Sequence, residues 1–227
     1  MKTIILITLL VLLPSVLFSN NKKSLEESEN YQSDKNYNTP KNENNIIVYA
    51  TYKYNAIPDF MLKPFFDEFQ SVNGHSFSIQ TSFKTGNFAY TIDLDFMNLS
   101  AKDGYWAQKD KAPDYFILDT TYLNLGINFE WFFTLSPKFQ MISSIGLGFG
   151  TFLGEMTKYK TAGTHPDPTN PHFEKEDLKP PFFGHILIAI AAQYEVYKVK
   201  GKSPVYLRIN MGFKNSLFIG TSLGYQF

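Results

Sequence analysis

The sequence predicts an all-β fold: an eight-stranded antiparallel up-and-down β-barrel that spans a membrane. Three observations lead to this prediction. Eight segments alternate apolar residues with small or polar ones, aromatic residues make up 17% of the 227 residues, and no apolar run beyond the N-terminal one reaches the length of a spanning helix. An exported chain of this kind forms either a soluble β-protein or a closed barrel.

Residues 1–19 are predicted to be a secretory signal peptide. Lys2 supplies the positive charge, an apolar run follows, and Pro14 ends that run. The alternative is an uncleaved anchor, but the apolar run ends near Phe18 and is shorter than the ~20 residues that span hydrocarbon. Residues 20–45 are rich in Asn, Lys, Glu and Ser without apolar periodicity, so they are expected to be disordered. Residues 46–227 are expected to form the barrel.

Strand alternation is clearest near the C-terminus. Leu217, Ile219 and Leu223 alternate with Gly220 and Ser222, which places one face in hydrocarbon and the other in a crowded interior. The same pattern predicts that Leu207 and Ile209 face lipid while Arg208 and Asn210 face the lumen. The predicted strands are 46–54, 75–83, 88–96, 121–133, 139–153, 184–196, 205–213 and 217–227.

The connections between these strands alternate in length. Long connections are expected outside the cell and short turns in the periplasm. The short turns are 84–87, 135–138 and 198–204, the long loops are 56–74, 99–114 and 154–181, and the last hairpin, 214–216, is a short outer connection. Aromatic residues near the short turns predict an interfacial girdle. These residues are Trp131, Phe132, Phe133, Phe139, Tyr194, Tyr197, Tyr225 and Phe227.

A soluble β-sandwich is the alternative fold, and its outer face would be polar. The polar faces of these strands instead carry Gly, Ser and Asn, which suit a narrow lumen, while Lys and Glu concentrate in the loops and the N-terminal segment. The pattern therefore favours the membrane barrel.

The chain resembles the small bacterial outer-membrane barrels of the OmpA-transmembrane or OmpX kind. The specific residues are Leu223, Tyr225 and Phe227, which resemble the signal that the barrel-assembly machinery reads. Elsewhere the resemblance is architectural, over residues 46–227, and no loop motif matches. It implies the outer membrane of a Gram-negative bacterium, export through the periplasm, and outer-membrane lipid and the assembly machinery as partners.

Charged residues are predicted to point into the lumen: Asp93, Asp95, Glu130, Glu195 and Arg208, with Lys53 and Lys84 as candidate partners. Bare charges in a small interior are costly, so these groups are expected to be paired in a network that plugs the barrel. A proton or ion path is the alternative, which an eight-stranded barrel disfavours because side chains just fill it.

Other segments suggest no cofactor. The glycines of residues 146–150 lie inside a predicted strand, which indicates close packing rather than a nucleotide loop. The long loop 154–181 lacks tight metal-ligand spacing among its histidines and carboxylates and is interpreted as a surface loop. Those residues are His165, Asp167, His172, Glu174, Glu176 and Asp177. The aromatic loop 56–72 is expected to pack over the barrel mouth, with contact to lipid or a partner as the alternative.

His75, His185, Ser76 and Ser78 lie near the predicted outer strand ends and are the candidates for an enzymatic role. The motifs of lipid-modifying hydrolases and acyltransferases do not match. Neutral net charge gives no sign of nucleic-acid binding, and the absence of cysteine excludes thiol chemistry and disulfides. The sequence predicts a non-enzymatic, monomeric barrel for envelope structure or loop-mediated recognition of an extracellular partner. A narrow channel and a lipid-modifying enzyme are the alternatives.

Overall fold

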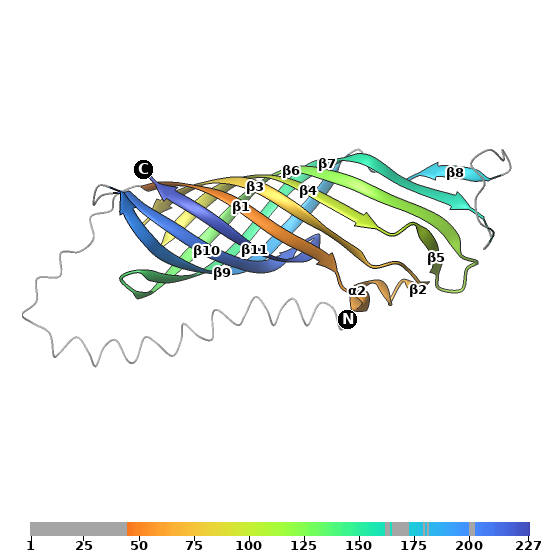
Figure 1. Ribbon diagram of the computed structural model, residues 1–227, viewed down its shortest axis with the longest axis horizontal. Helices are drawn as coiled ribbons and strands as arrows, with labels where there is room; N and C mark the ends of the chain where they lie inside the picture. The colour runs from red at the N-terminus through yellow and green to blue at the C-terminus, as the bar shows by residue number, and fades with distance from the viewer. Residues whose placement is uncertain (1–44, 162–163, 165–172, 179, 181, 200–202) are drawn as a thin grey trace, which may run out of the picture. The chain divides into compact units, whose positions relative to one another are not determined.

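Figure 1 shows the computed structural model, which describes residues 45–161, 164, 173–178, 180, 182–199 and 203–227. The predicted signal peptide and nearly all of the predicted polar segment fall on residues 1–44, outside the described residues. In the described part of the chain, no helix combines the length and apolarity that crossing a membrane requires.

The chain folds as an eight-stranded antiparallel transmembrane β-barrel, as predicted. Consecutive barrel strands pair with each other, and the first closes on the last through a register that runs from Ile47 opposite Gln226 to Ala56 opposite Leu217. The barrel strands are β1 (Asn45–Ile57), β3 (Val72–Thr85), β4 (Phe88–Ala101), β6 (Asp114–Ser136), β7 (Phe139–Lys160), β9 (Phe183–Val199), β10 (Ser203–Lys214) and β11 (Ser216–Gln226). Closure leaves the barrel wall without a free edge.

The short turns and the long connections lie at opposite ends of the barrel, here named the turn end and the loop end. At the turn end, Gly86 between β3 and β4 takes a left-handed φ of 59°, and Pro137-Lys138 separate β6 from β7. At the loop end, Asn215 alone joins β10 to β11, again with a left-handed φ of 59°. The predicted alternation of long and short connections is therefore confirmed.

Strand alternation sets which side chains meet the outside of the barrel. Leu147 is 62% exposed and Ile209 51% exposed, whereas Arg208 between two exposed neighbours is 2% exposed. The predicted facing of β10 is confirmed, because Leu207 is also exposed and Asn210 is half-buried. An outer surface of large apolar side chains is stable in the hydrocarbon of a membrane and unfavourable in water.

The girdle prediction is wrong for one aromatic residue. Trp131 faces outward, so its neighbour Phe132 must face inward, and Phe132 is 1% exposed. It packs inside the turn end with Ala89, Ile142 and Ala191. Sequence proximity to a turn was a poorer guide here than strand parity.

Two barrel strands extend well beyond their predicted limits. Residues Tyr115–Thr120 of β6 pair with Gly154–Tyr159 of β7. The first stretch precedes the predicted strand 121–133, and the second was expected in the loop 154–181. The prediction failed because Tyr115, Phe116, Ile117 and Leu118 are consecutive apolar residues without alternation. The extension carries β5 (Gly104–Gln108) on one side and β8 (Glu174–Asp177) on the other (Figure 1).

The aromatic loop 56–72 contains the short helix α2 (Asp59–Leu62) and β2 (Phe66–Glu68), which pairs with β5. Leu62, Phe66 and Phe69 pack against an apolar cluster at the loop end, so the predicted mouth packing is confirmed for them. That cluster consists of Val72, Met97, Leu99, Trp106 and Tyr122. Phe60 and Phe65 remain 67% and 66% exposed.

Candidate functional site

The interior of the barrel holds two buried charge clusters. The cluster nearer the turn end centres on Arg208, whose Nη1 and Nη2 donate to the two carboxylate oxygens of Glu130 at 3.0 and 3.4 Å. Arg208 Nε donates to Gln193 Oε1 at 3.1 Å, and the same oxygen accepts from the Tyr49 hydroxyl at 2.8 Å. The guanidinium also lies 4.0 Å from the centre of the Tyr49 ring. Bidentate pairing and ring stacking satisfy this cation on several sides.

The second cluster lies nearer the loop end and joins two lysines to two aspartates. Lys214 Nζ donates to Asp93 Oδ2 at 3.0 Å and to Asp95 Oδ2 at 2.8 Å. Lys53 Nζ reaches Asp95 Oδ2 at 3.4 Å, and Asn124 Nδ2 donates to the same oxygen at 3.4 Å. These four charged side chains are at most 4% exposed, and their charges cancel.

The predicted inward set is thus divided between two clusters, with two corrections. Glu195 does not join the Arg208 cluster: it lies at the turn-end rim, where Lys198 is 3.5 Å away. A register shift between Val205 and Tyr206 accompanies its pairing. Lys84 bonds to Gln140 at 3.4 Å and lies over the Phe132 ring at 4.2 Å, rather than pairing with a carboxylate.

Sequence reasoning missed Lys214, which was assigned to the hairpin turn. The structure ends β10 at Lys214, one residue later than predicted, and buries its side chain in the lumen. Strand parity could have found it, because positions 208, 210 and 212 already face inward and 214 continues that series.

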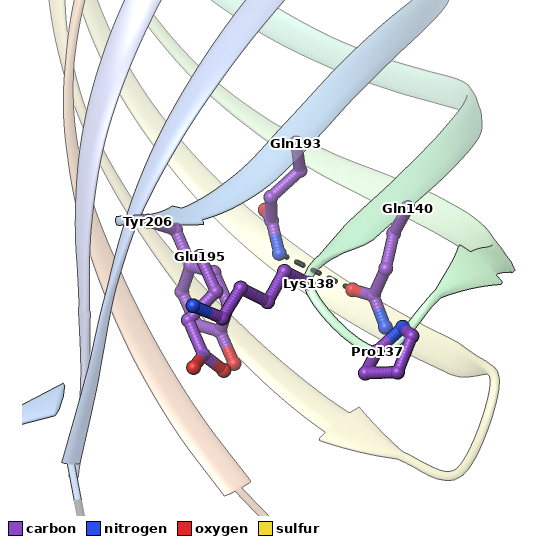
Figure 2. Close-up of a pocket in the computed structure, with 6 residues that line it drawn as sticks. All are labelled: Pro137, Lys138, Gln140, Gln193, Glu195 and Tyr206. Atoms are coloured by element: carbon purple, nitrogen blue, oxygen red, sulfur yellow. Dashed lines mark hydrogen bonds between the residues drawn. The ribbon is translucent and has the colours of Figure 1, made fainter. Parts of the chain in front are cut away.

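Two apolar clusters pack inside the barrel beside the polar interior. Phe132, Ile142, Ala89 and Ala191 form one apolar cluster, and the apolar cluster of the loop end is the other. At the turn end a depression of about 30 Å³ remains, lined by Lys138, Gln140, Gln193, Glu195, Tyr206 and Pro137 (Figure 2). Figure 2 shows Gln193 donating to Gln140 across it, at 3.3 Å. This depression has the size of a water molecule.

The glycines of β7 let the wall approach its neighbours, as predicted. A Cβ on Gly148 would lie 2.5 Å from His185 Cε1, and one on Gly146 would lie 2.1 Å from Asn128 Oδ1. His185, buried beside Gly148, lies 3.3 Å from the Tyr122 hydroxyl through Nδ1. The run is a packing feature inside a strand, not a phosphate loop.

The residues weighed for catalysis do not converge. His75 is exposed on the outer wall, where its Nδ1 lies 2.6 Å from the Tyr52 hydroxyl. Ser76 and Ser78 are buried on the inner face, because alternate residues of β3 point to opposite sides. His75 therefore has neither serine as a partner.

The loop 154–181 is described only in part. His165, Asp167 and His172 lie outside the described residues. Glu174 and Glu176 belong to β8 and pair with Lys160 at 2.9 Å and Lys158 at 3.3 Å. In the described ranges, no three histidines or carboxylates are grouped as metal ligands.

No family model and no curated protein matches the chain. Among solved structures it is similar to Ail, the attachment invasion locus protein of Yersinia pestis, at 9% identity and a TM-score of 0.40, over 82% of this chain and 99% of that chain. The β domain of the Bordetella autotransporter Brka matches at 9% identity and a TM-score of 0.38, over 81% and 99%. A de novo designed transmembrane β-barrel matches at 11% identity and a TM-score of 0.37, over 81% and 96%.

Proposed function

We propose that this chain is a non-enzymatic, monomeric outer-membrane protein of a Gram-negative bacterium, whose closed barrel displays its loop end for recognition at the cell surface. The proposal rests on the filled barrel interior and on the additional elements at the loop end, α2, β2, β5 and β8. Arg208, Tyr49 and Tyr122 are among the largest fully buried side chains, and charges in the lumen are paired rather than offered to a solute. The structured part that remains for function is the loop end, with its extended strands, β2, β5 and β8.

Orientation follows from the same proposal. Export through the periplasm on the predicted signal peptide would leave the short turns in the periplasm and the long loops outside. Lys109 and Lys111 lie exposed at the loop end, and Lys138 lies exposed in a short turn at the opposite end. Trypsin added to intact cells should therefore cut at the first two lysines and spare Lys138 until the cells are opened.

The class itself is tested by fractionation. The protein should enter the outer-membrane fraction and run as a compact band that shifts on heating, since a closed sheet resists detergent until boiled. A protein recovered from the soluble periplasm, or trypsin cleavage at Lys138 in intact cells, would overturn the proposal.

We also propose that Leu223, Tyr225 and Phe227 are read by the barrel-assembly machinery. Leu223 and Phe227 are exposed on the outer face, and the Tyr225 and Phe227 rings meet edge to face at 4.8 Å. Phe227→Asp should lower the amount of assembled barrel while leaving export intact. Gln226→Asp, on the neighbouring position, is the control. Normal levels of the Phe227 variant in the outer membrane would contradict this role.

A further inference from the structure

An open groove of about 760 Å³ lies at the loop end, between the connection that follows α2, the β4–β5 turn and the start of β6. Its size is that of a ligand site rather than of a gap between side chains. The barrel interior, by contrast, is filled. This groove has room for another molecule, and the proposed function leaves it without an occupant.

Carboxylates dominate the charge of this groove. Four acidic side chains and two lysines, Lys63 and Lys102, line it, and all six are exposed. The acidic residues are Asp59, Asp67, Glu68 and Asp103. In the described part of the chain none of these carboxylates is in an ion pair. The two lysines that line the groove can balance at most two of these four negative charges.

The acidic residues of the adjacent extension are arranged differently. Glu174 pairs with Lys160, Glu176 with Lys158, and Glu155 with Lys175 at 3.5 Å. Acidic residues are therefore neutralised on β7 and β8 but left free in the groove. This contrast within one end of the molecule points to a cation from outside the protein.

Two tyrosines supply aromatic surface in the same groove. The ribbon of β5 and β6 has two faces: Trp106 and Phe116 turn toward the barrel mouth, while Tyr105 and Tyr115 line the groove. The two tyrosine rings meet edge to face at 5.4 Å. Partial burial and the neighbouring Asp103 carboxylate raise the pKa of the Tyr115 hydroxyl, as expected in a negative local field.

We propose that this groove binds a basic, extended segment of another protein, with lysine or arginine side chains as the recognised groups. Their ammonium or guanidinium heads would meet the free carboxylates in charge-assisted hydrogen bonds, and their methylene stems would lie along the tyrosine rings. Aromatic faces also attract cations directly. Four carboxylates against two lysines select for a cationic ligand and against an anionic one.

The test uses the full chain in neutral detergent micelles and two labelled probes, hexalysine and hexaglutamate, read by fluorescence anisotropy. Hexalysine should bind and hexaglutamate should not, and added salt should weaken binding. Asp67→Asn with Glu68→Gln should weaken hexalysine binding about tenfold, which corresponds to about 1.4 kcal/mol. Tyr105→Ala should weaken it as well, and Tyr105→Phe should preserve it because the ring face remains.

The matched control removes the same charge elsewhere at the loop end. Glu174→Gln with Glu176→Gln should leave hexalysine binding within about twofold of the unmodified protein, because these carboxylates are already paired. Equal losses from the two double variants would show attraction by net charge alone and overturn the proposal. Binding of hexaglutamate, or displacement of hexalysine by the neutral sugar chitohexaose, would overturn it too.

The inference rests on the proposed function only in that the loop end must face the medium. If trypsin shows the loop end inside the cell while hexalysine still binds the groove, the proposed orientation fails and the groove stands. If the loop end is on the surface and the groove variants bind as the unmodified protein does, the groove assignment alone fails.

Discussion

Lys214 is a buried interior residue that sequence reasoning missed. It bridges both aspartates of its cluster from the last position of β10. Asp93, Asp95, Glu130 and Arg208 were predictable because they occupy the inward positions of strands whose alternate residues are apolar. Lys214 was not, because a Lys-Asn-Ser sequence is typical of a turn and only the structure shows that the strand includes it.

Replacing Lys214 should therefore be costly. In Lys214→Met, Lys53 alone would face two buried carboxylates, and breaking a buried pair in this way costs about 3–5 kcal/mol of folding free energy. Urea titration of the barrel folded into lipid vesicles measures the loss. Asp93→Asn in the same chain should recover part of it, because one orphaned charge is removed.

Lys160→Met is the matched control, since Lys160 pairs with Glu174 at a similar distance of 2.9 Å but in the solvent-exposed extension. Water already screens that pair, so its loss should change stability little. Equal destabilisation by the two lysine substitutions would contradict the distinction between interior and exposed pairs.

Among the elements, strand existence and facing were predictable and strand length was not. The sequence alternates apolar and polar residues wherever one face of a strand contacts lipid and the other faces the lumen. Beyond the hydrocarbon that contrast ends, so the paired residues 115–120 and 154–159 show no alternation. β5 and β8 were equally unpredictable from the sequence, because both are short. β8 also consists only of charged residues, and it pairs with the lysine-containing end of β7.

Strand facing is tested by two neighbouring substitutions in β10. Ile209→Arg should destabilise the folded barrel by roughly 2–4 kcal/mol, the cost of a cation on the lipid face near the midplane. Asn210→Arg should cost less, because Asn210 is half-buried on the inner face beside Ser222 Oγ, at 2.7 Å. Both are measured by urea titration in vesicles. A larger loss at Asn210 would mean that the facing of β10 is reversed.

At the scale of the whole molecule, the barrel has a filled interior, and its loop end carries the additional elements α2, β2, β5 and β8. Two charge clusters and two apolar clusters fill the interior. The sequence predicted the charged filling but not the apolar clusters, because Phe132 was expected in the interfacial girdle and Met97 had no assigned role. A filled lumen disfavours the channel alternative on physical grounds, because an ion would have to displace paired charges.

Purified protein in planar bilayers should accordingly show no stable conductance steps. The reason is that Arg208, Glu130, Lys214 and the aspartates are paired with one another across the lumen. Reproducible steps whose ion selectivity changes in Arg208→Ala would instead establish a conducting lumen and contradict the proposed role of the interior.

The distribution of the paired charges along the chain has a consequence for the order of folding. The acidic partners lie on β4 and β6, whereas Arg208 and Lys214 arrive with β10, 78 residues after Glu130 and 119 residues after Asp95. Until the last hairpin docks, the sheet has Lys53 of β1 beside Asp95 but lacks the partners that Arg208 and Lys214 give to Glu130 and Asp93. These unpaired carboxylates resist transfer into lipid. The last hairpin therefore closes the barrel wall and neutralises the buried carboxylates in the same step. A truncated or unfinished barrel lacks that neutralisation, which opposes its insertion into the membrane.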